Sequence, residues 1–216
     1  MRLDRLLACR EYAYHLTNRG NLARIARLKE LTSTASLYAA AGEDLGALEV
    51  KRAGQRTIVV QGEPVHIRDQ DPLHAGNVEL NGGWDFARFC LYLNQHVFFW
   101  PGTADGPIAY GRNHFGRYEA TSEELAFLRI PMAALAEANS PPGPKVCRYN
   151  SGSPRCNAGR GSPRGPETFV PVAEFPGIPS EVKEVVFEGT ARLPLETTWS
   201  SASSGPYLPL AEFEAS

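Results

Sequence analysis

The sequence predicts an α+β fold in a single domain of 216 residues. Early in the chain, helical patterns alternate irregularly with short strand patterns, and late in the chain strand patterns occur without helices. A doubly wound sheet is disfavoured, because there is no regular βαβ alternation and no glycine-rich phosphate loop after the first strand. A chain of this length also lies within the range that one hydrophobic core can fill.

The first elements follow from the spacing of apolar residues. Residues 3–10 and 21–31 carry Leu and Ile at helical spacing, and Asn21 stands at the N-cap position of the second helix. Between them, residues 12–16 alternate and predict a short strand. Residues 32–41 are expected to form another helix. The fold therefore opens with a strand that leads into a helix.

The middle of the chain predicts a hairpin, a helix and a buried strand. The β-branched runs 57–60 and 65–67 flank a turn at 62–64, which is typical of a hairpin. Residues 84–93 have aromatic and aliphatic side chains at helical spacing. The apolar run 97–100 predicts a buried strand that ends at the Pro-Gly pair following it.

The last third contains a long polar segment between strands. Residues 139–166 are rich in Pro, Gly, Ser, Asn and Arg, which predicts one long loop or several turns with too little apolar content to supply core. Residues 168–172 and 182–187 predict two strands. The tail from Trp199 onward is expected to be irregular, except for residues 208–213.

Charge excludes a globally basic nucleic-acid binder. The formal net charge is −2, and although Arg is abundant, the chain has only four Lys residues. This bias more often reflects a GC-rich genome than a phosphate-binding surface. The near-neutral total leaves room only for a local basic groove.

Cellular location and metal content follow from the N-terminus and the cysteines. Residues 1–17 mix Arg and Asp with apolar residues and lack a small-residue cleavage site, so they do not resemble a signal peptide. No stretch approaches the roughly 18 apolar residues needed to span a bilayer. We expect a cytoplasmic protein with no membrane partner and four reduced cysteines. The CxxC spacing of structural zinc is absent, so no metal is predicted.

Polar residues beside the apolar strands are the candidates for chemistry, because nucleotide-loop, zinc-protease, hydrolase and kinase motifs are missing. Several of these candidates also have a purely structural interpretation. A histidine on a strand can be a core residue with a hydrogen bond, and Arg68 can form a local ion pair with Asp69. Glu184 can be the polar-face residue of a half-buried strand, with Glu181 or Glu188 as the functional carboxylate. The candidates are His15, Arg68, Asn94, His96, the segment 150–152 and Glu184.

Several short motifs occur together in one order. They are YHLT at 14–17 followed by NLxxI, then IRDQ at 67–70, LNxxVFFW at 93–100, NSG at 150–152 and RGxxTF at 164–169. With these motifs the chain resembles a family of uncharacterised bacterial proteins, and that family in turn resembles the DarT-type ADP-ribosyltransferases. The resemblance extends from about residue 14 to residue 186. It rests on a first strand with His and Thr, a helix opening with Asn-Leu, an aromatic middle strand and a late strand with Glu.

The resemblance implies an ADP-ribosyltransferase-like fold, in which a split, mainly antiparallel sheet holds NAD in a cleft. It implies NAD-binding roles for His15 and Thr17 on the first strand and for Asn21 at the start of the next helix. It implies that Arg68 acts on the NAD phosphate or at the reacting centre, and that Glu184 is the catalytic carboxylate. A loop that recognises the target is expected after Asn150-Ser151-Gly152, with Ser151 near the cofactor.

The chemistry of NAD agrees with these residue types. Cleavage of the bond between nicotinamide and ribose develops positive charge on the ribose, which a carboxylate stabilises, as in glycoside cleavage. Pyrophosphate favours the planar donors of Arg. Phe99 or Trp100 could pack on the nicotinamide ring, although the run Phe98-Phe99-Trp100 is more typical of the core than of a stacking surface.

The acceptor is left open between nucleic acid and protein. Four arginines in the long loop could contact nucleic-acid phosphates, or the loop could be a solvated linker: Arg148, Arg155, Arg160 and Arg164. A role in toxin or phage-defence biology would bring an antitoxin or hydrolase partner. The alternatives are a non-enzymatic nucleotide-binding module on the same fold, an NAD hydrolase, and an RNA 2'-phosphotransferase-like enzyme.

Overall fold

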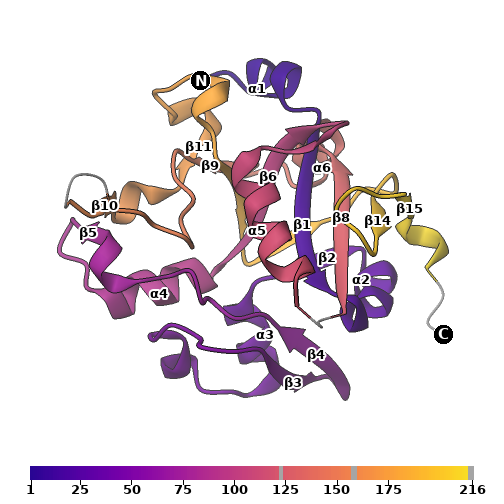
Figure 1. Ribbon diagram of the computed structural model, residues 1–216, viewed down its shortest axis with the longest axis horizontal. Helices are drawn as coiled ribbons and strands as arrows, with labels where there is room; N and C mark the ends of the chain where they lie inside the picture. Colours follow the sequence, from indigo (N-terminus) through magenta and orange to yellow (C-terminus); the bar gives the residue numbers. More distant parts are fainter. Residues whose placement is uncertain (122–123, 157–159, 214–216) are drawn as a thin grey trace.

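The computed structural model describes residues 1–121, 124–156 and 160–213, and they form an α+β fold (Figure 1). The main sheet has nine strands in the order β11-β9-β12-β6-β1-β8-β14-β15, with β7 paired to β6. All of its ladders are antiparallel, which confirms the predicted α+β class with a mainly antiparallel sheet. Its strands are β1 (Tyr12–Asn18), β6 (His96–Thr103), β7 (Gly106–Pro107), β8 (Leu125–Pro131), β9 (Lys145–Cys147), β11 (Val170–Pro171), β12 (Glu184–Glu188), β14 (Thr198–Ser200) and β15 (Leu208–Pro209).

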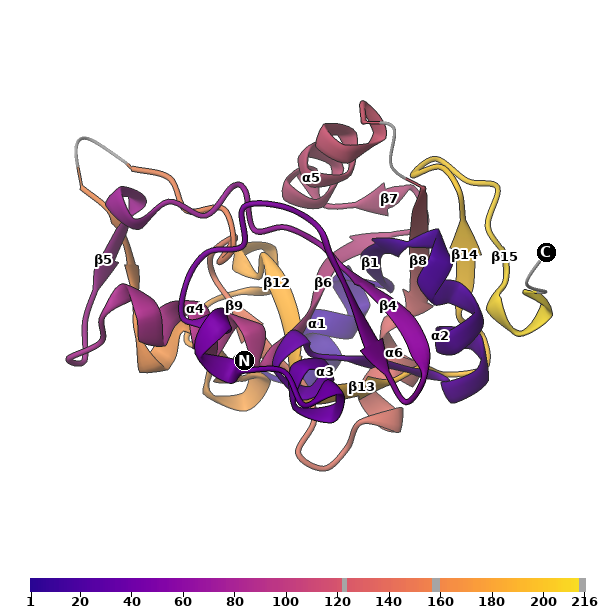
Figure 2. The same cartoon turned by 90° about the horizontal axis from the view of Figure 1, so that it is seen from below.

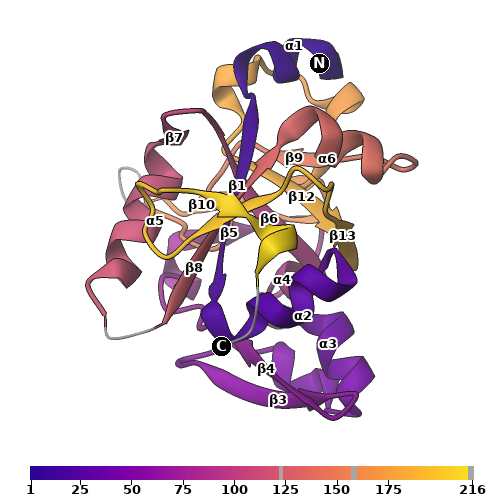
Figure 3. The ribbon, with the colours of Figure 1, turned by 90° about the vertical axis from the view of Figure 1, so that its right-hand side faces the viewer.

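Helices and three small sheets surround the main sheet. The α-helices are α1 (Leu3–Cys9), α2 (Leu22–Leu28), α3 (Thr34–Ala41), α4 (Phe86–Asn94), α5 (Ala109–Glu119) and α6 (Met132–Ala138). The small sheets are β2 (Glu30–Thr32) with β13 (Thr190–Arg192), β3 (Arg56–Val60) with β4 (Glu63–Ile67), and β5 (Val78–Leu80) with β10 (Ser162–Arg164). Figures 1 and 2 show β5 and β10 at one end of the molecule and β14 and β15 at the other. Figure 3 shows α1 and the β3–β4 hairpin at opposite ends of β1.

The main sheet buries side chains on both faces. Val97 and Phe99 of β6 pack with Leu128 of β8 on one face. Trp100, on the opposite face of β6, packs with Phe115 of α5. This alternation follows from the two-residue period of a strand. Because β6 and its neighbours are covered on both sides, their polar residues are held in fixed positions.

Most of the predicted elements are present. The helix expected at 3–10, the strand at 12–16, the hairpin at 57–67, the helix at 84–93 and the strand at 182–187 correspond to α1, β1, β3 with β4, α4 and β12. The helix expected at 32–41 begins two residues later as α3. Its N-cap side chain, Ser33, accepts a hydrogen bond from the backbone nitrogen of Ser36, which fixes this start.

The helix expected over residues 21–31 is shorter than predicted. It consists of a 3-10 turn (Arg19–Asn21) followed by α2 (Leu22–Leu28), after which the chain forms β2. Lys29 adopts a left-handed conformation with φ of 53°, which turns the backbone out of the helix. Asn21 occupies the N-cap position, but its side chain makes no capping hydrogen bond.

The prediction that the strand at 97–100 ends at the Pro-Gly pair was wrong. Strand β6 continues through Pro101 and Gly102 to Thr103. The Pro101 carbonyl accepts from the backbone nitrogen of Ile108, away from β1. The nitrogen of a strand residue points to the same side as its carbonyl, so the missing N–H of Pro101 is not needed for the ladder with β1.

The strand predicted at 168–172 is mostly absent. Pro166–Thr168 form a 3-10 turn, and only Val170 and Pro171 pair with β9. The hydroxyl of Thr168 bonds both the nitrogen and the carbonyl of Gly165, so the segment satisfies its polar groups locally. Proline also removes a ladder donor at Pro171.

The segments expected to be irregular contain paired strands. In residues 139–166, β9 pairs with β12, and its Val146 and Cys147 are fully buried, so the prediction that this segment supplies no core was wrong. β10 pairs in parallel with β5. Residues 157–159 of this segment lie outside the described residues. In the tail, β14 pairs with β8, which extends the main sheet.

Candidate functional site

The main sheet divides at one point, and a cavity lies in the division. The ladder between β1 and β6 ends where Tyr14 faces Trp100. Beyond this pair, β1 continues along β8 as far as Asn18, whereas β6 stays with β12 from Phe99 to His96. Figure 1 shows the two strands diverging below this point. A cavity of about 260 Å³ opens between the two half-sheets.

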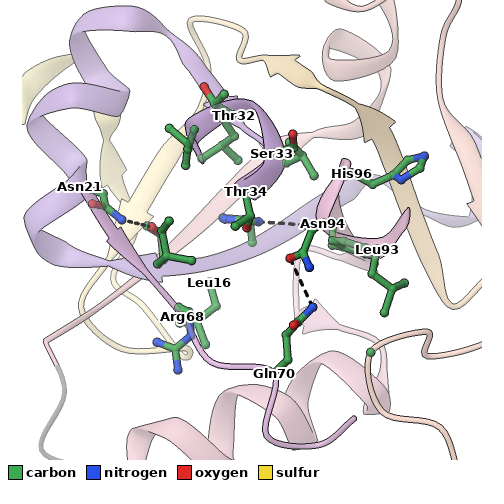
Figure 4. A pocket seen from close by; sticks show the side chains of 18 of the residues that line it. Leu16, Asn21, Thr32, Ser33, Thr34, Arg68, Gln70, Leu93, Asn94 and His96 are labelled. Carbon is green, nitrogen blue, oxygen red and sulfur yellow. Dashed lines mark hydrogen bonds between the residues drawn. The ribbon is translucent and has the colours of Figure 1, made fainter. Parts of the chain in front are cut away.

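The other walls of the cavity come from segments distant in sequence (Figure 4). The junction of β2 and α3 contributes Thr32, Ser33 and Thr34. The loop after β4 contributes Arg68 and Gln70 on another side, and α4, β6 and the segment 150–153 complete the wall. Aliphatic side chains such as Leu31 and Leu93 share the wall with many polar and charged side chains, so the cavity can hold a polar small molecule.

His15 lies at the point of division. Its Nδ1 is 2.8 Å from the carbonyl oxygen of Phe98, on the strand that has just left β1. A carbonyl only accepts, so Nδ1 carries the hydrogen in the neutral ring and Nε2 is an acceptor. Burial lowers the pKa of His15 to about 4; the bond to Phe98 opposes this, and the charge of Arg68 adds to it. His15 is therefore a neutral imidazole at physiological pH.

Glu184 is the first residue of β12 and lines the same cavity. The backbone nitrogen of Ser151 donates to Oε1 at 3.0 Å, and the Ser151 hydroxyl donates to Oε2 at 2.5 Å. Burial raises the pKa of Glu184 to about 7, although the bonds from Ser151 and the charge of Arg164 lower it. Of the three carboxylates left open by the sequence, only Glu184 lines the cavity: Glu181 binds Arg148, and Glu188 binds Lys145.

Arg68 follows β4 and lines the cavity, as predicted for a residue at the site. Its guanidinium lies over the ring of Tyr118 on α5, 3.8 Å from the ring centre. The hydroxyl of Tyr118 donates to Asp69 at 2.8 Å. The loop after β4 and helix α5 are thus joined across the cavity, and a cation–π contact holds the Arg68 charge at its edge.

His114 is a polar residue of the site that the sequence analysis missed. It lies on α5 with its ring 4.5 Å from Trp100 and 4.9 Å from Tyr118. Burial, and then the charge of Arg68, lower the pKa of His114 to about 3. Its position one helical turn before Tyr118 is a signal that only becomes visible once α5 is known.

Thr17 and Asn21 line the cavity, but their polar groups are used within the protein. Asn21 donates to the Thr17 hydroxyl at 3.1 Å and to the carbonyl of His66 at 2.8 Å (Figure 4). Its Oδ1 accepts from the backbone nitrogen of His66 at 2.9 Å. The side chain of Asn21 fixes β4, and with it the position of Arg68, while the predicted contact between Asn21 and a ligand stays a prediction.

Arg52 was not recognised in the sequence, yet it lines the cavity beside Arg68. Its Nε donates to the carbonyl of Arg68 at 3.0 Å, and its Nη1 donates to Oδ1 of Asn94. The Asn94 amide nitrogen donates to the carbonyls of Leu48 and Cys90. Asn94 therefore acts as a fixed support for Arg52, and Figure 4 shows it turned toward Gln70.

Two predicted cofactor contacts are not available. Phe99 is fully buried in the core against Phe187 and does not itself line the cavity, although its ring lies 5.6 Å from that of His15. Ser151 is also fully buried and contacts Glu184 instead of the cavity. The neighbours of Phe99 in β6 line the cavity instead: Val97, Phe98 and Trp100.

His96 is a structural residue. Its Nδ1 bonds the carbonyl of Tyr92, and its ring packs 4.7 Å from both Tyr92 and Phe169. Burial lowers the pKa of His96. Figure 4 shows its ring pointing away from Thr34 and Arg68.

The four loop arginines do not form one surface. Arg164 is 2% exposed and donates to two backbone carbonyls, so the prediction that it contacts external phosphate was wrong. Arg148 is ion-paired with Glu181 at 3.4 Å. Arg155 and Arg160 are exposed.

The described residues 1–121, 124–156 and 160–213 contain no group of three or more acidic, His or Cys side chains placed to hold a metal ion. Within the same ranges, none of the helices has the length and apolar character required to cross a membrane. Among the polar groups of the cavity are the neutral imidazole of His15, the buried carboxyl of Glu184, which titrates near neutrality, and the guanidinium groups of Arg52 and Arg68. Together they can bind hydroxyls and anions and can move a proton.

Comparison with known proteins gives one match. The model of a family described as "Family of unknown function (DUF7002)" matches residues 11–197. The matched segment contains all the cavity residues from His15 to Glu184. No curated protein and no solved structure matches the chain.

Proposed function

The chain belongs to the family of unknown function DUF7002, and from the geometry of its cavity we propose that it is an NAD-dependent ADP-ribosyltransferase. The observation that carries the proposal is the division of the sheet between β1 and β6 with His15 and Glu184 facing one cavity. An ADP-ribosyltransferase-like fold requires such a split sheet.

The protonation states suit the two roles. A neutral His15 donates from Nδ1 to Phe98, which leaves Nε2 to accept a hydrogen bond from a ribose hydroxyl. Trp100 of β6 also lines the cavity and offers an aromatic surface for the nicotinamide ring. In the proposed complex NAD is the substrate and binds between the two half-sheets.

The reaction breaks the bond between the ribose carbon and the nicotinamide nitrogen. Nicotinamide leaves with the bonding electrons, positive charge develops on the ribose, and the acceptor attacks that carbon and loses a proton. The ionised Glu184 stabilises the positive charge or takes the proton. A carboxyl with a pKa near 7 is ionised in about half of the molecules at neutral pH, so activity should rise with pH through this range.

For the acceptor we propose a nucleic acid or a protein. Arg155 and Arg160 are exposed on the segment that follows Ser151, the residue that bonds Glu184, and there they can contact phosphate groups. Action as a toxin or in phage defence, with an antitoxin or hydrolase that reverses the modification, belongs to the same proposal.

A non-enzymatic nucleotide-binding module is the second candidate. The observation that favours it is that Ser151 bonds both oxygens of Glu184. A carboxyl held in this way is a structural group unless binding of the substrate releases it. NAD hydrolysis would use the same residues with water as acceptor, whereas an RNA 2'-phosphotransferase would not need Glu184.

The first test is isothermal titration with NAD. Saturable binding is expected for the wild type and for His74→Ala, a control at an exposed histidine outside the cavity, and at least tenfold weaker binding is expected for His15→Ala. Absence of binding at millimolar NAD would refute the proposal. Release of nicotinamide by the wild type, lost in Glu184→Gln with NAD binding retained, would separate the transferase or hydrolase from the binding module.

A further inference from the structure

The guanidinium of Arg52 forms no ion pair with an acidic side chain of the described residues. The ion pairs in the described part of the chain involve other basic residues, among them the adjacent Lys51 with Asp71 and the nearby Arg56 with Glu43. The partners of the Arg52 side chain are a carbonyl oxygen and an amide oxygen, both uncharged. The charge of Asp69 acts on Arg52 without an ion pair between them, and Oδ1 of Asp69 accepts from Tyr118 and from the backbone nitrogen of Asp71.

The site fixes Arg52 at several points. Its backbone nitrogen donates to the side chain of Gln70, and its backbone carbonyl accepts from the Gln70 nitrogen at 2.9 Å. Asn94, which is itself buried and bonded to two backbone carbonyls, holds the guanidinium. Two of the five guanidinium N–H groups are used in this way, and the other three make no hydrogen bond within the described residues.

A cation that is partly removed from water and has no counter-charge is costly to keep. Desolvation lowers the pKa of Arg52, which is the expected sign of that cost. A guanidinium held rigidly with free donors on a cavity wall is also a favourable binding site for phosphate, because its planar fork forms two parallel charge-assisted hydrogen bonds.

We propose that Arg52 is the anion-binding residue of the cavity and that it receives a phosphate group of a nucleotide ligand. The supply of three free donors and the absence of a carboxylate partner carry this assignment. Identification of the ligand as NAD rests on the function proposed above, whereas the phosphate contact of Arg52 does not. Arg68, held over Tyr118, then lies beside the phosphate subsite.

The experiment is titration of the whole chain with three probes: ADP-ribose, inorganic pyrophosphate and adenosine. The variants are Arg52→Gln, Arg52→Lys and the control Arg56→Gln, which removes a nearby arginine that pairs with Glu43 and does not line the cavity. Thermal unfolding and a two-dimensional amide NMR spectrum establish that each variant is folded.

In Arg52→Gln, we expect the dissociation constants of ADP-ribose and pyrophosphate to rise about ten- to a hundredfold, with that of adenosine unchanged. Arg52→Lys should recover only part of this, because an ammonium group lacks the planar fork. Arg56→Gln should bind as the wild type does.

Two outcomes would overturn the assignment. One is that neither pyrophosphate nor ADP-ribose binds the wild type, and the other is that Arg52→Gln binds both as tightly as the wild type. The two proposals are separable. Pyrophosphate binding that depends on Arg52, without any NAD turnover, would support the anion site and count against the transferase. NAD turnover that is unaffected in Arg52→Gln would support the transferase and count against the anion site.

Discussion

Replacement of Glu184 by Gln should change how stability depends on pH. The carboxyl is 2% exposed, and burial raises its pKa from 4.5 to about 7. Between these two values the unfolded chain has lost this proton and the folded chain has kept it, so folding becomes less favourable as the pH rises. The loss is roughly 1.4 kcal/mol per pH unit, or about 3 kcal/mol in total. The stabilising effect of the protonated form is complete below pH 4.5 and is lost through pH 7.

Glu184→Gln has the same shape and can keep both contacts with Ser151, one as an acceptor and one as a donor. The variant should therefore gain stability relative to the wild type by up to about 3 kcal/mol between pH 4.5 and pH 8. The measurement is urea unfolding of both proteins at half-unit pH steps. Taking the difference removes the contributions of the buried histidines, which titrate in both proteins. Parallel stability curves over this range would refute the assignment of a raised pKa to Glu184.

Three further substitutions test the surroundings of the site. The hydrogen bond from the Ser151 hydroxyl lowers the pKa of Glu184, and Ser151→Ala removes that bond. The pKa of Glu184 measured by ¹³C NMR should therefore move above 7 in this variant; an unchanged value would show that the hydroxyl has no influence. Asn21→Ala leaves the backbone of His66 without its partners and should lower the free energy of unfolding by about 1 to 3 kcal/mol in a denaturant titration, whereas a neutral effect would contradict the clamp. Phe99→Ala should lower it by about 3 to 5 kcal/mol, and an unchanged free energy of unfolding would contradict its place in the core.

The sequence predicted the elements whose local pattern was strong. The hairpin, α4 and β12 follow from β-branched runs and helical spacing, and neighbouring elements do not alter them. Strand β8 was missed, although its run of apolar residues from Leu125 is a signal for a strand buried on both faces. Helix α5 has a weak apolar pattern and two glycines, and Gly111 is needed there because a side chain would collide with Trp100. Tertiary packing, which a local pattern does not contain, decides that position.

The candidate site shows the same division between local and tertiary information. His15, Thr17, Asn21, Arg68 and Glu184 were each named from the sequence, and the structure brings all five to one cavity. Their states could not be read in advance. The sequence placed Asn21 at a helix start, but the return of β4 past α2 turns it into a clamp. Sequence patterns report which residues lie on a strand, whereas burial and partners depend on which strands meet.

Arg52 was missed for a related reason. It lies in a segment with no regular secondary structure, between Lys51 and residues that form no periodic pattern, so its sequence context resembles a solvated loop. Its significance arises from the separate placement of Asn94 and Arg68, which fix its guanidinium, and from the lack of an ion pair with any carboxylate in the part of the chain that the structure describes.

The cavity unites three ionisable groups whose environments oppose their usual charge states. His15 is kept neutral by burial, Glu184 titrates near pH 7, and Arg52 is desolvated without an ion pair among the described residues. Each arrangement destabilises the fold, and a structural role alone would be met as well by an apolar or amide side chain of the same size. Perturbed groups that cluster in a cavity are typical of a functional site. Their coincidence where β1 separates from β6 is what the proposed ligand binding and proton transfer would require.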